Sequence, residues 1–260
     1  VHALFSAKDL TEECNYTGPI IHDDEVFASK TVTCNGQPIA AVVAVDQITA
    51  QRAARKVQVK YQELEPVIIT VEDAINCKSF LLDSPYKLER GDVDAVFANT
   101  PYIIEGECRT GGQEHFYFET QCTLAVPKEE DEMEIFCSTQ HPSEINKAVS
   151  HMLKIPQNKL VTKVKRMGGG FGGKESKSFV VALPVALAAN RLNRPVRCML
   201  DRDEDMLISG TRHPFLIKYK AAFDKNGKIL VIEAFIYSNG GNTSDLSEPV
   251  LHRAMFHIDN

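Results

Sequence analysis

The sequence lacks several features that would assign it to a class at once. Its 260 residues contain no tryptophan, no Cys-x-x-Cys pair and no apolar run long enough to span a membrane. The seven cysteines are widely scattered, so we do not expect an iron–sulfur or zinc site built from them alone. Basic residues are not in excess, and the formal net charge is -6. Because phosphate contacts require a basic surface, this charge argues against a nucleic-acid partner.

What the sequence contains is typical of a globular protein. Hydrophobic residues make up 43% of the chain and charged residues 25%, which allows one large domain or two smaller ones. The odd number of unpaired-looking cysteines favours reduced thiols in an intracellular compartment. The chain does not begin with methionine, and we expect it to be a piece of a longer protein.

The first part of the chain has the pattern of a compact α+β unit. Asn35-Gly36 separates two stretches with strand character, so these stretches are predicted to form a β-hairpin. The expected elements, in order, are strands at 30–34 and 38–45, a helix at 47–56, a strand at 57–61 and a helix at 71–76.

The middle of the chain predicts a domain boundary. Residues 76–100 carry turn signals at Ser84-Pro85 and Gly91-Asp92 and show little periodicity, so we interpret them as a linker. Residues 1–75 would then form one domain, and residues 101–260 would belong to a second. The predicted fold class is α+β.

Strands dominate the second domain. His115, Tyr117 and Glu119 would share one face of a strand, because side chains alternate along it. The expected strands are 102–108, 113–126, 132–139, 160–164, 195–200, 217–223 and 229–238, and the expected helices are 142–153, 176–191, 201–207 and 246–256.

The most informative stretch is Arg166-Met-Gly-Gly-Gly-Phe-Gly-Gly-Lys-Glu175, in which five of ten residues are glycine. Clustered glycine predicts backbone with positive φ or a close approach to something bulky. Bare amides between a strand and a helix N-terminus suit an anionic or electronegative ligand. Glu175 is expected in the first helical turn, where the helix dipole stabilises its carboxylate.

Two other interpretations of this stretch are open. Gly168, Gly170 and Gly173 spell the G-x-G-x-x-G of dinucleotide-binding sites, but the predicted strand–helix–strand unit is longer than the ~30 residues typical of that fold. Phe171 also occupies the position where the backbone would approach a pyrophosphate. The plainest alternative is a glycine-rich turn that binds no ligand.

Several motifs together resemble the molybdenum hydroxylases, the family of the xanthine dehydrogenases and aldehyde oxidases. Lys165–Glu175 resembles the molybdenum-cofactor loop of that family, and the xanthine dehydrogenase branch fits better. The other shared motifs, in the same order, are Thr33-Cys34, Gly36-Gln37, Val67–Asp73, Gly111–Glu119, Ser138–Gln140, Pro195–Asp205, Arg212–Phe215 and Arg253–Phe256.

The resemblance implies a cytoplasmic or peroxisomal homodimer with FAD, [2Fe-2S] clusters and a molybdenum–molybdopterin centre. Residues 1–75 would be the end of a hammerhead-like α/β domain, and residues 101–260 the first part of a mixed-sheet molybdopterin-binding domain. Such an enzyme hydroxylates hypoxanthine to xanthine and xanthine to urate, with oxygen from water and NAD+ as the acceptor. This chain would hold part of the molybdopterin site and would bind neither FAD nor [2Fe-2S]. Neither a nucleic acid nor a membrane is expected as a partner.

The metal and cofactor residues carry over from the matching motifs. By this resemblance Gln140 would lie beside the oxo ligand of the molybdenum, and the Phe171 amide would donate to the metal's ligand sphere. Gly170 and Gly172 would border the cofactor.

The purine-binding residues carry over in the same way. Glu175 and Arg253 would orient the purine, and aldehyde oxidases tend to lack this pair, which favours the purine enzymes. The family's general base is a glutamate that would lie beyond Asn260. We therefore expect no catalytic residue within this chain, and we expect the chain alone to be inactive.

Overall fold

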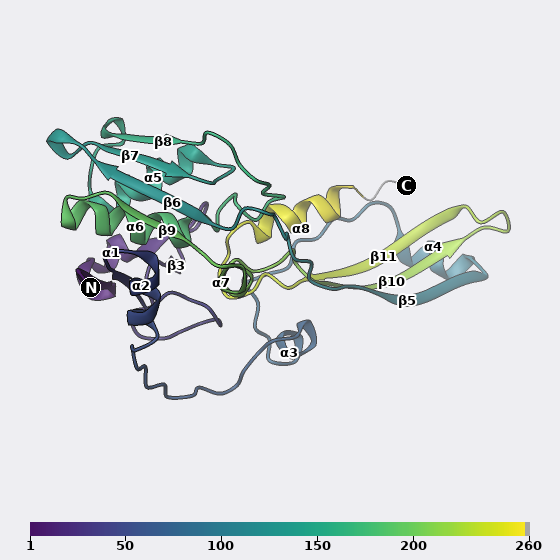
Figure 1. Ribbon diagram of the computed structural model, residues 1–260. Helices are drawn as coiled ribbons and strands as arrows, with labels where there is room; N and C mark the ends of the chain where they lie inside the picture. The colour runs from purple at the N-terminus through teal and green to yellow at the C-terminus, as the bar shows by residue number, and fades with distance from the viewer. Residues whose placement is uncertain (258–260) are drawn as a thin grey trace. The chain divides into compact units, whose positions relative to one another are not determined.

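The structure, a computed structural model, describes residues 1–257 and divides the chain into two compact units (Figure 1). Each unit is made of two separate stretches. Unit 1 contains residues 1–62 and 114–211, and unit 2 contains residues 63–113 and 212–260. None of the helices within residues 1–257 has the length and apolar character needed to cross a membrane.

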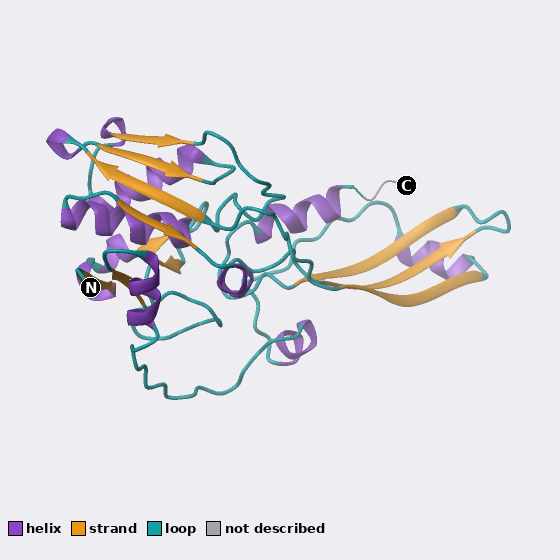
Figure 2. Ribbon diagram, viewed as in Figure 1, coloured by secondary structure: helices purple, strands orange, loops and turns teal. Residues whose placement is uncertain are grey.

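The main layer of unit 1 is a four-stranded sheet with two long helices packed against it (Figures 1 and 2). Strands β7 and β8 are parallel, whereas β6 runs antiparallel to both of its neighbours. Helix α5 packs on β8, and α6 packs on β6 and β9. The strands, in spatial order, are β8 (Leu160–Lys163), β7 (Met133–Cys137), β6 (Cys122–Pro127) and β9 (Val196–Met199); the helices are α5 (Pro142–Leu153) and α6 (Phe179–Leu192).

The core of unit 1 lies between this sheet and its helices. Residues of β7 alternate, so that Ile135 faces inward and is fully buried. Helix α6 is apolar on all sides, which is the pattern of a helix enclosed by its neighbours. Ile145 of α5 and Leu187 of α6 are also fully buried, and each such side chain stabilises the fold by about 1.5–3 kcal/mol.

The remaining elements of unit 1 are short. Strand β1 pairs with β4, and β2 pairs with β3, both antiparallel. The Asp46 carboxylate caps α2 by accepting a hydrogen bond from the Thr49 amide at 2.7 Å. These elements are β1 (Ala3–Ser6), α1 (Glu12–Asn15), β2 (Tyr16–Thr17), β3 (Asp24–Glu25), β4 (Ala40–Val43), α2 (Gln47–Ala54) and α7 (Arg202–Ile208), with 3-10 turns at Ala7–Asp9, Glu129–Asp131 and Gln157–Lys159.

Unit 2 is built on a three-stranded antiparallel sheet of long strands, in the order β11, β10, β5. Helix α4 packs against β11. The Tyr86 hydroxyl donates a hydrogen bond to the Glu248 carboxylate, which joins the loop between α3 and α4 to α8. The elements are α3 (Val71–Asn76), α4 (Val93–Asn99), β5 (Tyr102–Thr110), β10 (Phe215–Phe223), β11 (Ile229–Ser238) and α8 (Ser247–Phe256).

The structure confirms the mixed α and β fold class and most long elements, but the predicted hairpin around Asn35-Gly36 is wrong. Strand β4 pairs with β1 instead, and residues 30–34 form no strand. Gly36 does form a turn with φ of 85°, and a Cβ there would lie 2.7 Å from the carbonyl oxygen of Leu207. The turn therefore packs against the end of α7 rather than closing a ladder.

Two further predictions, the strand at 57–61 and the full length of the strand at 113–126, are wrong. Residues 57–61 alternate, yet they form no strand, and Tyr61 is 65% exposed. Residues 76–100 contain helix α4, whose N-terminus Asp92 caps. The predicted strand 113–126 has its ladder only from Cys122 onward, because Phe116 has a φ of 45° and turns the chain out of extended backbone.

Candidate functional site

The glycine loop, residues 166–175, is a succession of tight turns between β8 and α6. Gly169, Phe171 and Gly172 have φ values of 94°, 52° and 89°. The Gly173 amide donates to the Gly170 carbonyl at 2.8 Å. Phe171 is 75% exposed, and within the described residues its amide donates to no acceptor. The loop therefore presents a backbone N–H at its surface.

Gln140, just after β7, holds the loop through three hydrogen bonds. Its main-chain amide donates to the Lys174 carbonyl at 2.8 Å. Its side-chain Oε1 accepts from the main-chain amides of Gly172 at 2.9 Å and Lys174 at 3.2 Å. A Cβ on Gly170 would lie 2.6 Å from that Oε1, so glycine leaves the space that the carboxamide fills. With Oε1 engaged by the loop, the Nε2 group is the part of Gln140 that can donate to a ligand.

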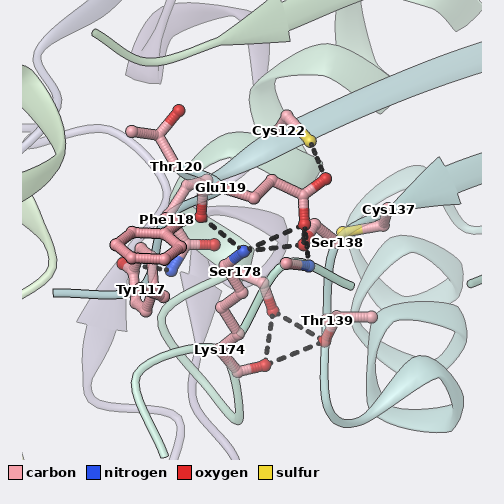
Figure 3. Close-up of polar contacts among 12 residues, drawn as sticks. Tyr117, Phe118, Glu119, Thr120, Cys122, Cys137, Ser138, Thr139, Lys174 and Ser178 are labelled. Atoms are coloured by element: carbon pink, nitrogen blue, oxygen red, sulfur yellow. Dashed lines mark hydrogen bonds and ion pairs between the residues drawn. The ribbon is translucent and has the colours of Figure 1, made fainter. Parts of the chain in front are cut away.

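The Lys174 side chain, at the end of the loop, is fully buried, and its ammonium makes the polar contacts drawn in Figure 3. It donates to the Glu119 carbonyl at 2.7 Å and to the Ser138 hydroxyl at 2.8 Å, and it lies 3.3 Å from a Glu119 carboxylate oxygen. It also lies 4.5 Å from the centroid of the Tyr117 ring.

The Glu119 carboxylate fastens the other end of the loop. It accepts from the Gly168 amide at 2.8 Å and from the Ser138 hydroxyl at 2.6 Å. Partial burial is the largest influence on this carboxyl and raises its pKa, but the Gly168 amide, the Ser138 hydroxyl and Lys174 together lower the pKa below its ordinary value. Glu119 is therefore held as a carboxylate.

A second buried hydrogen-bond network supports the loop. Its members belong to residues 117–121 and to α7. The Tyr117 hydroxyl donates to the Asp205 carboxylate at 2.7 Å, and the Gln121 amide donates to the other Asp205 oxygen at 2.5 Å. The Gln121 Nε2 donates to the Gly173 carbonyl at 2.8 Å. Burial, followed by the bond to Asp205, raises the pKa of Tyr117 to about 12.

The structure brings together four of the residues suggested by the sequence: Gln140, Gly170, Phe171 and Gly172. It corrects the position of Glu175, which is exposed and lies before α6 rather than in its first turn. The Lys174 carbonyl accepts hydrogen bonds from the Gln140 main-chain amide and the Thr139 hydroxyl. Because this carbonyl is not used for a helical hydrogen bond, the helix begins only after Glu175. Arg253 lies on α8 of unit 2.

The sequence analysis missed the residues that hold the loop from behind. Lys174 lies among glycines in a stretch of loop, where a solvated side chain is the usual expectation. Asp205 belongs to the charged run Asp201–Asp205, of which it alone is fully buried. His115 and Tyr117 were expected on one strand face; they lie on irregular backbone, although their rings stack with centroids 6.2 Å apart.

The sheet argues against a dinucleotide site at this loop. Strands β8 and β9, on either side of α6, lie at opposite edges of the sheet with β7 and β6 between them. The doubly wound nucleotide-binding fold instead uses neighbouring parallel strands. The G-x-G-x-x-G spacing therefore occurs here without the strand arrangement of a dinucleotide-binding fold.

Comparison with known families assigns most of the chain to one family. A family model described as "Molybdopterin cofactor-binding domain" matches residues 77–260. The chain belongs to this family. A second model, described as "Aldehyde oxidase and xanthine dehydrogenase, a/b hammerhead domain", matches residues 1–65.

Similar proteins support membership of the molybdopterin cofactor-binding domain family. The chain is 56% identical over its whole length to a xanthine dehydrogenase of Drosophila pseudoobscura pseudoobscura and 55% identical to one of Calliphora vicina, in each case covering 19% of the relative. It is 54% identical over 99% of its length to a xanthine dehydrogenase/oxidase of Rattus norvegicus, again covering 19%. The chain thus spans about a fifth of the length of these relatives.

Solved structures with the same fold include two oxidoreductases. Quinoline 2-oxidoreductase from Pseudomonas putida 86 matches with a TM-score of 0.77 and 24% identity, over 91% of this chain and 32% of that one. Aldehyde oxidoreductase from Desulfovibrio gigas matches with a TM-score of 0.78 and 23% identity, over 92% of this chain and 28% of that one.

The donor set of the loop fits the cofactor of the molybdopterin cofactor-binding domain family. The Phe171 amide and the Gln140 Nε2 group are donors, which suits electronegative cofactor atoms. Gly172 has no neighbour within 4 Å of a built Cβ, so nothing of this chain crowds that side of the loop. These residues could hold part of a molybdenum–molybdopterin group.

Proposed function

We propose that this chain is part of a xanthine dehydrogenase that hydroxylates hypoxanthine to xanthine and xanthine to urate. Oxygen would come from water and electrons would pass to NAD+. The observation that carries the proposal is the loop anchored on Gln140, which exposes hydrogen-bond donors and lies in a chain 56% identical to a xanthine dehydrogenase. When bound, the molybdenum–molybdopterin cofactor supplies the centre that takes up the electrons of the substrate.

In this proposal the loop holds the cofactor by donating hydrogen bonds. The Gln140 Nε2 group would donate to one electronegative atom of the cofactor, and the Phe171 amide would donate to another. Gly170 provides the space that keeps Gln140 against the loop, and Gly172 leaves the cofactor side uncrowded. Fixed donors of this kind need little reorganisation during the reaction.

Two charged residues would orient the purine. The Glu175 carboxylate, exposed at the end of the loop, accepts from a purine N–H, and the Arg253 guanidinium donates to a purine carbonyl. A purine offers both kinds of group along its edges, whereas a simple aldehyde offers no N–H. The pair therefore favours a purine substrate over an aldehyde.

The rest of the proposed enzyme follows the family. Residues 1–75 would end the hammerhead-like domain, residues 76–100 would link it to the next, and residues 101–260 would begin the molybdopterin-binding domain. FAD, [2Fe-2S] clusters and the NAD+ site would lie in the remainder of the protein. The whole protein would be a homodimer of the cytoplasm or peroxisome.

The test compares Glu175→Gln with Glu12→Gln in the full-length protein that contains this chain. Glu12 is an exposed glutamate of α1 and serves as the matched control. We expect Glu175→Gln to lower kcat/KM for xanthine by at least about tenfold, the effect of losing one charged hydrogen bond in the transition state, while Glu12→Gln leaves it unchanged.

Substrate preference tests the proposal further. The wild-type protein should prefer xanthine to benzaldehyde, and Glu175→Gln should reduce that preference. If the wild-type protein oxidises benzaldehyde in preference to xanthine, it is an aldehyde oxidase and the proposed purine activity is refuted. Unchanged kcat/KM for xanthine in Glu175→Gln would refute the assigned role of Glu175.

A further inference from the structure

The buried ammonium of Lys174 has no place in the roles given so far. Its side chain is fully buried, yet it lies directly behind the loop whose front carries the donors. A buried ammonium is costly unless its charge and its hydrogen bonds are met. Here both are met, because the Glu119 carbonyl, the Ser138 hydroxyl and the Glu119 carboxylate surround it.

These contacts join three separate pieces of chain at one point (Figure 3). Lys174 belongs to the end of the loop, and Ser138 lies two residues before Gln140 in the segment after β7. The Glu119 carboxylate also accepts from the Gly168 amide, at the start of the loop. One ion pair thus fixes both ends of the loop and the segment that carries Gln140.

Lys174 is linked to Gln140 from its main chain as well. Its carbonyl accepts from the Gln140 amide, and its amide donates to the Gln140 Oε1. The side chain points back to Ser138 and Glu119, so a shift of the ammonium would move the two main-chain bonds that orient the Gln140 carboxamide.

Stability alone does not account for this arrangement. Replacing both members of a buried ion pair by well-packed neutral groups is often neutral or stabilising, so a charged pair is weak support for a fold. Directional bonds to three acceptors instead fix one geometry. We propose that Lys174 is a positioning residue, whose ammonium, held by Glu119 and Ser138, sets the glycine loop and the Gln140 carboxamide in the arrangement that receives the cofactor. The cofactor part of this inference rests on the proposed function.

The test uses three variants of the full-length protein: Lys174→Met, the double variant Lys174→Met with Glu119→Gln, and the control Lys147→Met. Lys147 forms an ion pair with Glu144 on the exposed face of α5, so its loss removes a lysine and a salt bridge away from the loop. Lys174→Met leaves the Glu119 carboxylate without its cation, and the double variant removes that charge as well.

The first readout is amide hydrogen exchange in the cofactor-free protein. We expect the amides of Gly172 and Lys174, which donate to Gln140, to exchange at least about tenfold faster in Lys174→Met, while amides of β6 and α6 stay close to wild type. Lys174→Met should also lower the denaturation midpoint, because it leaves the Glu119 carboxylate without its cation. The double variant should restore the midpoint but not the protection of these two amides. Lys147→Met should match wild type throughout.

The second readout is turnover of xanthine per bound molybdenum. Lys174→Met should lower kcat by about tenfold or more with KM within about twofold, since it disturbs the donors to the cofactor and not the purine contacts. Wild-type protection of Gly172 and Lys174 in Lys174→Met, or faster exchange spread evenly over β6 and α6, would overturn the positioning role. The exchange result decides that role even if the wild-type protein binds no molybdenum, which would refute only the proposed function.

Discussion

Gln140 and Lys174 are joined by two hydrogen bonds that run in opposite directions. The Gln140 amide donates to the Lys174 carbonyl at 2.8 Å, and the Lys174 amide donates to the Gln140 Oε1 at 3.2 Å. This pairing locks both the main chain and the side chain of Gln140 to the loop. The oxygen of the carboxamide is thereby assigned to the protein, and the nitrogen is left for a ligand.

Exchanging the Gln140 nitrogen for an oxygen tests this assignment. Gln140→Glu keeps an acceptor for the Gly172 and Lys174 amides but replaces the donor group, so we expect a folded loop and a kcat for xanthine lowered by roughly 10²-fold in the full-length protein, the usual effect of losing one preorganised donor. Gln140→Ala removes both functions and should also speed amide exchange of the loop. Normal kcat in Gln140→Glu would show that the nitrogen has no part in turnover.

The space at Gly170 gives a second prediction. A Cβ there would lie 2.6 Å from the Gln140 Oε1, so Gly170→Ala should displace the carboxamide and lower the free energy of unfolding by about 1–2 kcal/mol. Gly111→Ala is the control, because a Cβ at that position meets nothing within 4 Å. Its unfolding free energy should stay within about 0.5 kcal/mol of wild type, as measured by denaturant titration. Equal effects of the two substitutions would contradict the prediction.

The elements that could be predicted from the sequence are those whose own pattern is strong. Helix α5 was predicted at its observed bounds, because it begins with Pro142 at an early helical position and carries an apolar stripe. Strands β10 and β11 were predicted because each is long and is bounded by turn residues. In these cases local preference and tertiary packing agree.

The failures occur where a partner far along the chain decides the structure. Residues 57–61 alternate as a strand does, but within residues 1–257 they pair with no other strand. Strand β4 pairs with β1 although Asn35-Gly36 suggests a nearer partner. Periodicity gives the character of a segment and says nothing of the segment that it meets.

The site residues that could be predicted from the sequence differ in the same way from those that could not. Glycine clustering pointed to the loop, because backbone with positive φ favours glycine, and the shared motifs pointed to Gln140, Gly170, Phe171 and Gly172. They could not point to Lys174 and Asp205, since charged residues are exposed by default and only the fold shows that Glu119 and Tyr117 meet them.

The cysteines provide a probe of unfolding. Burial, the largest cause, raises the pKa of Cys137 to about 11, whereas Cys77 and Cys108 are exposed. Since the thiolate is the reactive form, we expect iodoacetamide at neutral pH to modify Cys77 and Cys108 first and Cys137 only as the protein unfolds. Mass spectrometry of peptides at increasing denaturant measures this order. Cys108→Ser should remove one of the fast sites and leave the protection of Cys137 unchanged, and early modification of Cys137 would contradict the described core.

The Tyr117 hydroxyl gives a prediction at alkaline pH. Burial and the bond to Asp205 raise the pKa of Tyr117 from 10.0 to about 12 in the folded protein. As pH rises past the ordinary tyrosine pKa, the unfolded state loses this proton first, so the stability that Tyr117 contributes is fully present below about pH 10 and is lost as pH approaches 12. The loss corresponds to roughly 2–3 kcal/mol of unfolding free energy.

Tyr117→Phe separates this effect from the general alkaline response. The variant should be less stable at neutral pH, because the buried Asp205 carboxylate loses a donor, but its stability should fall less steeply between pH 10 and 12. Tyr61→Phe is the control, since Tyr61 is 65% exposed, and it should follow wild type. Denaturant midpoints across this pH range, with tyrosinate absorbance recorded alongside, measure both slopes. Parallel declines in wild type and Tyr117→Phe would mean that the proton of Tyr117 is not linked to folding, and that the network around Asp205 is looser than the structure describes.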